Sequence, residues 1–222
     1  MVVEKNDFGS GSDFLGLGLY AFGTLGLEIV LAFLIEPFIF NKSFDNFTTI
    51  ENILHWITTC VIWLIIAYAL VRTSKKRYGF DIFFYRRPME PLNRFICLGL
   101  LIIAIIISYI NWEGFKIWKE FLNNGWLKFI FQYIYYFVET ILFVLIVVFG
   151  QKAGEIWFGR GSIPWGGILV ALTWGLAHIF TKGELMMGIW GLVIGLLYGL
   201  VYIVSKKNLF IAFPIIFLMF IL

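Results

Sequence analysis

The sequence predicts an all-α polytopic membrane protein, a bundle of about seven transmembrane helices that forms a single membrane domain over residues 1–222. Of the 222 residues, 61% are hydrophobic and only 14% are charged, and the mean hydropathy is +0.90. A soluble domain of this length does not need so much apolar surface. Aromatic residues make up 20% of the chain and gather near the ends of apolar runs, as in interfacial belts. We therefore expect membrane lipid as the surroundings and a multi-pass location in the plasma membrane.

The apolar residues form seven runs, each close to the ~20 residues that cross a bilayer. The first run is long and contains Glu28, Glu36 and Pro37, which predicts one tilted helix or a helix with a kinked end. The last run is short. The runs are Leu15–Phe40, Leu54–Val71, Phe95–Trp112, Trp126–Gly150, Trp165–Phe180, Met186–Ser205 and Leu209–Leu222.

Positive charge predicts the orientation. The loop between the second and third runs is the most basic, and by the positive-inside rule it is cytoplasmic. The basic residues of two later connections, each two spans further on, then lie on the same side, so the N-terminus is expected inside and the C-terminus outside. The lysines between the third and fourth runs fit least well. The first loop contains Arg72, Lys75, Lys76, Arg77, Arg86, Arg87 and Arg94; the later connections contain Lys152, Arg160, Lys206 and Lys207; the lysines that fit least well are Lys116, Lys119 and Lys128.

Several classes of function are disfavoured. The net charge of +3 is small and belongs to loops, so nucleic acid is not expected as a partner. Cys60 and Cys97 lie in apolar runs, which argues against a disulfide framework. A catalytic zinc needs three protein ligands, and with His55 and His178 as the only histidines we expect no metal and no cofactor. The polar segment Met1–Asp13 precedes a run too long for a signal-peptide core, so no cleavage is expected.

Glu139 and His178 are the most informative residues. They lie inside consecutive apolar runs, and ionisable side chains in hydrocarbon are costly, so we expect them to face each other at a functional site. Counted from the connection between the two runs, Glu139 is 11 residues deep and His178 is 15 residues deep. At ~1.5 Å per residue their depths differ by only about 6 Å.

A carboxylate and an imidazole at one depth suit the activation of water, because Glu139 can take a proton from a water that His178 holds. The residues around Glu139 are polar or aromatic, and they are Gln132, Tyr135, Tyr136, Thr140 and Phe143. The alternative is a hydrogen bond between Glu139 and His178 that fastens two helices without chemistry. The sequence leaves both interpretations open.

Small residues predict a close helix contact. Gly191, Gly195 and Gly199 recur every four residues on one face of the sixth run, and Ala171 and Gly175 form a similar face in the fifth. Helices in lipid associate through such faces, since small side chains let the backbones approach closely. We expect these glycines to serve helix packing.

Four stretches follow one another in a characteristic order over residues 139–217. Glu139-Thr140-Ile-Leu-Phe143-Val144 is followed by Trp174-Gly-Leu-Ala-His178. A glycine-rich stretch then leads from Gly195 to a polar turn at Asn208, and the last stretch is Phe213-Pro-Ile-Ile-Phe217.

This series resembles the CPBP family of intramembrane endopeptidases (CAAX protease and bacteriocin-processing, or Abi), which includes the type 2 CAAX prenyl proteases. The family motif Glu-Glu-x-x-x-Arg, usually with Phe before the Arg, is matched at Glu139 and Phe143, whereas Thr140 and Val144 replace its second Glu and its Arg. Trp174 replaces the Phe of the motif Phe-x-x-x-His. At the final motif, His-x-x-x-Asn, both polar residues are lost to phenylalanines. The chain therefore resembles a degenerate member.

The resemblance implies that Glu139 is the base, that His178 holds the water, and that Thr140, Phe143 and Trp174 support them. It also implies a peptide or a lipidated protein as substrate. In the family the last His and Asn stabilise the oxyanion, and their loss here argues against full activity. The hydroxyls or amides that are candidates to replace them are those of Tyr136, Tyr198, Tyr202 and Asn208.

Three functions remain open: an intramembrane glutamate-type endopeptidase, a catalytically silent relative that acts as an immunity or binding scaffold, and a small proton-coupled transporter. A transporter would use Glu28, Glu36 or Glu139, but the inverted repeats expected of one are not evident. Glu36 lies beside Pro37 near a run end, so we expect it to be solvated at the interface. The substrate, the recognition of a prenylated tail and the oligomeric state are not determined by the sequence.

Overall fold

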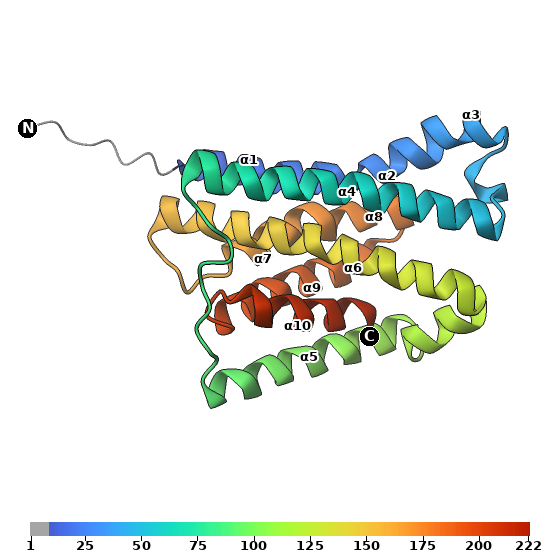
Figure 1. Cartoon of the computed structure of the whole chain (residues 1–222). Coiled ribbons are helices and arrows are strands. Elements are labelled where there is room, and N and C mark those ends of the chain that lie inside the picture. Colours follow the sequence, from blue (N-terminus) through green and yellow to red (C-terminus); the bar gives the residue numbers. More distant parts are fainter. Residues whose placement is uncertain (1–8) are drawn as a thin grey trace, which may run out of the picture.

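The computed structural model describes residues 9–222, and every regular element in that range is helical (Figure 1). Five helices are long and apolar enough to cross a membrane, and two shorter apolar helices accompany them, which confirms the predicted all-α fold and its apolar helices. The expectations for residues 1–8 lie outside the described range. The five long helices are Gly11–Phe40, Thr49–Tyr78, Pro91–Asn111, Lys116–Phe158 and Leu185–Val204, and the shorter ones are Trp165–Thr181 and Leu209–Ile221.

Of the two predicted alternatives for the first apolar run, one tilted helix or a helix with a kinked end, the structure has the kinked form. It is divided into α1 (Gly11–Leu25), α2 (Leu27–Val30), a π-helical turn η1 (Leu31–Ile35) and α3 (Glu36–Phe40). Pro37 explains the irregular turn, because proline lacks an amide hydrogen and excludes the carbonyl four residues earlier.

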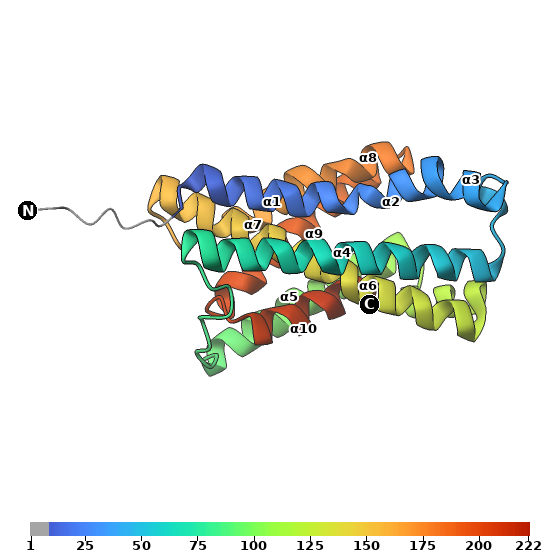
Figure 2. The same ribbon diagram turned by 45° about the horizontal axis from the view of Figure 1, so that its top comes forward.

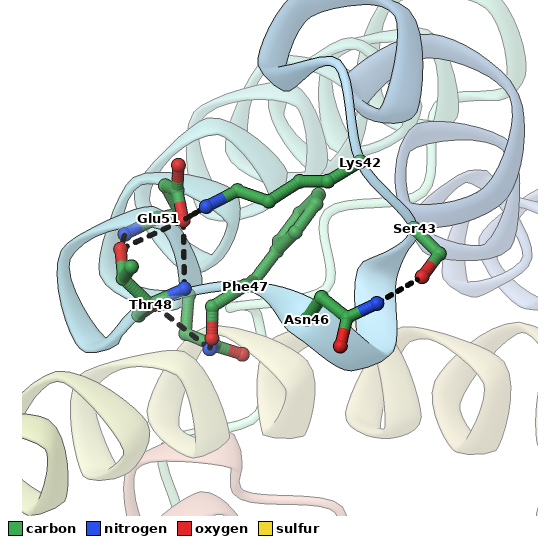
Figure 3. Close-up of polar contacts among 7 residues, drawn as sticks. Lys42, Ser43, Asn46, Phe47, Thr48 and Glu51 are labelled. Atoms are coloured by element: carbon green, nitrogen blue, oxygen red, sulfur yellow. Dashed lines mark hydrogen bonds and ion pairs between the residues drawn. The ribbon is translucent and has the colours of Figure 1, made fainter.

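The connection to α4 (Thr49–Tyr78) is fixed by polar contacts (Figure 3). Thr48 and Glu51 form a capping box at the start of α4, and Lys42 pairs with Glu51 at 2.7 Å. Asn46 donates to the Ser43 hydroxyl at 2.8 Å. These contacts set the position of the first turns of α4, where His55 lies.

Helix α6 (Lys116–Phe158) forms the centre of the bundle (Figure 2). In the most apolar 18-residue stretch of α6, 67% of the stretch is buried. The corresponding value for the peripheral α5 (Pro91–Asn111) is 11%. Helix α6 is interrupted at Gly125, whose φ of 66° and ψ of 171° suit glycine alone. The segment before this break, residues 116–124, folds back against the next turns, and Asn124 donates to Gln132 at 2.7 Å.

Three basic connections meet at one end of the bundle, which we call the basic end (Figure 1): the α4–α5 loop, the α6–α7 loop and the α9–α10 turn. Lys207 in the α9–α10 turn pairs with Glu155 of α6 at 2.6 Å. Asn208 donates to the carbonyl of Arg87 in the α4–α5 loop at 3.0 Å. The clustering of basic loops that the charge pattern predicted is therefore present.

The fifth and sixth runs form a close pair. The fifth comprises α7 (Trp165–Val170), a second π-helical turn η3 (Ala171–Gly175) and α8 (Leu176–Lys182), and it packs on α9 (Leu185–Val204), which α10 (Leu209–Ile221) follows. A Cβ added at Gly199 would lie 2.5 Å from the Cα of Gly167, and one at Gly191 would lie 2.8 Å from the carbonyl oxygen of Gly175. The two backbones touch without intervening side chains.

We expect Gly199→Ala to lower the free energy of unfolding by about 1–3 kcal/mol, because its new methyl group meets backbone that cannot move away locally. Thermal unfolding of the purified protein in detergent measures this change. Gly99→Ala in α5 is the matched control, since a Cβ there meets nothing within 4 Å, and it should be neutral or stabilising by up to about 1 kcal/mol. Equal losses in both variants would contradict the close contact.

Candidate active site

Glu139 and His178 each lie one helical turn from a pair of aromatic residues that are in contact, on helices that run in opposite directions (Figure 1). The rings of Phe143 on α6 and Trp174 on η3 are in contact, with centroids 4.7 Å apart. Glu139 lies one turn before Phe143, and His178 lies one turn after Trp174. Because the two helices are antiparallel (Figure 1), both steps lead away from the basic end, so Glu139 and His178 belong to neighbouring turns.

His178 is oriented by its own helix. Its Nδ1–H donates to the carbonyl oxygen of Trp174 at 2.8 Å, and its ring packs edge-on against the Trp174 indole with centroids 4.3 Å apart. With the proton on Nδ1, the neutral imidazole has its lone pair on Nε2. That nitrogen is the one that can accept a hydrogen bond from water.

Four rings from four elements form an aromatic cluster beside this level: Phe143 of α6, Trp174 of η3, Tyr198 of α9 and Phe220 of α10. Phe143 stacks on Tyr198 at 6.2 Å and meets Phe220 edge-on at 5.1 Å. Trp174 lies 6.2 Å from Phe220. These aromatic rings lie between the turns of Glu139 and His178 and the basic end of the bundle.

Within that aromatic cluster, Tyr198 has a buried hydroxyl without a hydrogen-bond partner among the described residues. The side chain is fully buried, and its oxygen has no hydrogen-bond partner within the described part of the chain. Glu139 is close enough for its charge to act on this hydroxyl, as it also does on Cys60 of α4 and on Tyr135. A buried hydroxyl without a partner is costly, which makes Tyr198 a candidate donor to a substrate.

The other donors considered from the sequence lie elsewhere, and two of them have hydrogen-bond partners. The Tyr136 hydroxyl donates to Glu120 at 2.6 Å, and Asn208 bonds the α4–α5 loop. Tyr202 lines a small cavity at the basic end, together with Glu155. None of these three takes the place that Tyr198 occupies beside the aromatic cluster.

Thr140 does not direct its hydroxyl into the site. The side chain is buried, and its hydroxyl donates to the carbonyl oxygen of Tyr136, one turn earlier on the same helix, at 2.8 Å. Threonine commonly satisfies itself in this way inside a helix. Phe143 and Trp174, in contrast, contact each other directly next to the candidate pair.

Phe213 and Phe217 lie on another side of α6 from Glu139. Both rings pack against Phe137, at 5.1 Å and 5.5 Å, and Phe137 lies two residues before Glu139, which is about 200° around the helix. The stretch that resembles the last CPBP motif therefore does not face the carboxyl. Phe220 of α10 contacts Phe143, and the buried residues of α10 are Leu209, Ala212, Ile216, Met219 and Ile221.

Glu36 contradicts the expectation of a solvated interfacial side chain. It is only 5% exposed, and its Oε2 lies 2.7 Å from Nδ1 of His55, which is itself fully buried. Glu28 lies 3.5 Å from the other ring nitrogen and accepts a hydrogen bond from Tyr135 at 2.7 Å. Sequence reasoning missed this second acid–imidazole group. The available signal was two acids eight residues apart on one helix and a histidine near the start of the next.

An apolar groove of about 410 Å³ lies on the face of α6 that contains Phe137, away from Glu139. Its lining residues are Phe129, Ile130, Tyr133, Ile134, Phe137 and Phe217.

Comparison of the chain with protein-family models, curated proteins and solved structures finds no match. The resemblance of residues 139–217 to the CPBP family therefore stays a prediction. Among the described residues, no group of three or more His, Cys, Asp or Glu side chains is arranged to hold a metal ion.

We expect Tyr198→Phe to leave the free energy of unfolding unchanged or to raise it by up to about 1 kcal/mol, because it removes a buried hydroxyl that lacks a partner. Tyr136→Phe is the matched control. It removes a hydrogen bond to the Glu120 carboxyl and should cost about 1.5–3 kcal/mol. Denaturant unfolding in detergent checks both values, and a large loss for Tyr198→Phe would show that its hydroxyl has a structural partner.

Proposed function

We propose that this protein is a multi-pass plasma-membrane endopeptidase of the glutamate type, which hydrolyses a peptide bond within the depth of the bilayer. The observation that carries the proposal is the Phe143–Trp174 contact, which brings the turns of Glu139 and His178 to one level on antiparallel helices. The order of stretches that resembles the CPBP family supports the same activity.

In the proposed reaction, Glu139 takes a proton from a water that is hydrogen-bonded to Nε2 of His178, and the water oxygen attacks the carbonyl carbon of the substrate. The carbon–nitrogen bond then breaks, and the proton passes from Glu139 to the departing amine. Tyr198 donates to the carbonyl oxygen as it becomes negatively charged. A hydroxyl already held in a buried site needs little reorganisation to do so.

The proposed substrate is a membrane-embedded peptide or a lipidated protein. A substrate of this kind reaches the bundle from the lipid, and the apolar groove beside Phe137 and Phe217 offers a surface for a hydrocarbon chain.

We propose seven spans with the N-terminus in the cytoplasm. The gathering of the α4–α5 loop, the α6–α7 loop and the α9–α10 turn at the basic end supports this orientation. The two short helices, α7–α8 and α10, complete the count beside the five long ones.

We expect Glu139→Gln and His178→Asn each to abolish proteolysis, because the first removes the base and the second removes the water-binding nitrogen. Tyr198→Phe should slow it on the order of a hundredfold. Mass spectrometry of new peptide termini in membranes that express each variant measures the cleavage. In ¹⁸O-labelled water, the new carboxyl termini should carry the label, as hydrolysis requires.

Glu184→Gln is the matched control, since it removes an exposed carboxylate outside the candidate pair. It should preserve every terminus that the wild-type protein generates. Identical termini in wild-type and Glu139→Gln membranes would overturn the proposed hydrolysis.

A catalytically silent immunity or binding scaffold is the second candidate. The observation that favours it is the phenylalanine pair of α10, which packs against Phe137 and supplies no polar group at the level of Glu139. Under this alternative the Glu139→Gln variant keeps the biological phenotype and shows no change in peptide termini.

A further inference from the structure

A second buried acid–imidazole group lies between the first helix and α4, apart from the candidate pair. His55 of α4 lies between two carboxylates of the first helix. Its Nδ1 is 2.7 Å from Oε2 of Glu36, and its Nε2 is 3.5 Å from Oε1 of Glu28. The His55 side chain is fully buried, and Nε2 has no hydrogen-bond partner among residues 9–222.

The placement of a carboxylate near each ring nitrogen favours an additional proton in this group. A neutral imidazole has one N–H and one lone pair, so one of its two nitrogens would direct a lone pair at a carboxylate oxygen. An imidazolium has N–H groups on both nitrogens and matches both Glu28 and Glu36. It also balances part of the negative charge of two carboxylates in an apolar environment, where such charge is otherwise costly.

The other charged and titratable groups around His55 do not replace this proton. Tyr135 of α6 donates to the second oxygen of Glu28 at 2.7 Å, so it adds a donor to the carboxylate and leaves the imidazole unchanged. The Nζ of Lys128 lies 5.6 Å from the ring centroid of Trp56, the residue after His55, so its charge faces that indole ring. Cys60 lies one turn further along α4, and Glu139 one turn beyond Tyr135; a thiol and a further carboxyl supply no positive charge.

The two carboxylates flank the π-helical turn η1 (Leu31–Ile35). Glu28 precedes this turn and Glu36 follows it, and both are directed at the same imidazole. We propose that Glu28, Glu36 and His55 form a proton-binding site, and that the bound proton clamps both sides of η1 to α4 and, through Tyr135, to α6. Loss of the proton releases the segment that contains η1 and α3.

Nitrogen NMR of the purified protein in lipid nanodiscs tests the proton directly. The chain has two histidines, so ¹⁵N-histidine labelling gives two imidazole signals, and His178→Asn assigns the one from His55. At neutral pH both His55 nitrogens should carry protons. Glu36→Gln should abolish the imidazolium signal, whereas Glu120→Gln, which changes another buried carboxyl, should preserve it.

Hydrogen–deuterium exchange tests the clamp at constant pH. In Glu36→Gln the amides of residues 31–40 should exchange at least tenfold faster than in the wild type, while those of α1 keep their rate. A neutral His55 at neutral pH, together with the absence of a protonated-carboxyl infrared band, would overturn the proton-binding site. Unchanged exchange over residues 31–40 would overturn the clamp.

Discussion

Hydrocarbon cannot hydrate a charge, and the arrangement of this bundle depends on how each buried ionisable group is matched by a neighbouring helix. The acids of the first helix meet His55 of α4, and Glu120 receives hydrogen bonds from Tyr133 and Tyr136 of α6. The first match joins the first helix to α4, and the second holds the segment before the Gly125 break against the following turns of α6. Apolar side chains pack equally well against lipid, so these polar pairings help to specify which helices are neighbours.

Close backbone contact supplies the second constraint. Gly199 against Gly167 and Gly191 against Gly175 bring α9 so near to α7 and η3 that no side chain fits between them. Trp174 and Tyr198 project from these two helices beside that contact, and both belong to the aromatic cluster. The glycines thereby determine how near the His178 helix and the Tyr198 helix can stand.

The apolar runs predicted where the helices lie, because every run of that length in lipid must satisfy its backbone internally. The ends were predicted less well. Helix α4 extends from Thr49 to Tyr78, beyond the apolar run, since the Thr48–Glu51 capping box and solvated lysines continue the helix outside hydrocarbon. The helical segment 116–124 was also not predicted, because it lies between the third and fourth apolar runs, and Gly125 separates it from the fourth run.

The candidate pair was chosen because acids and imidazoles are rare in apolar runs, and that reasoning applies equally to Glu36 and His55. It failed there because Pro37 suggested an end of the membrane span, and only the π-helical turn η1 aligns Glu28 and Glu36 on one imidazole. Both acid–imidazole groups lie next to π-helical turns, η1 and η3. Such turns often accompany functional sites. Their positions depend on tertiary packing that a single sequence does not reveal.

The folded-back segment 116–124 has a consequence for the order of assembly. Lys116 and Glu120 are both buried in it, and their partners are the carbonyl oxygen of Phe220 on α10 and the hydroxyls of Tyr133 and Tyr136. Glu120 has its two tyrosine partners within α6 itself, whereas the Phe220 carbonyl oxygen that accepts from Lys116 belongs to α10. The contact between Lys116 and Phe220 can form only when α10 is in place, so the packing of this segment is completed only after α10 has joined the bundle.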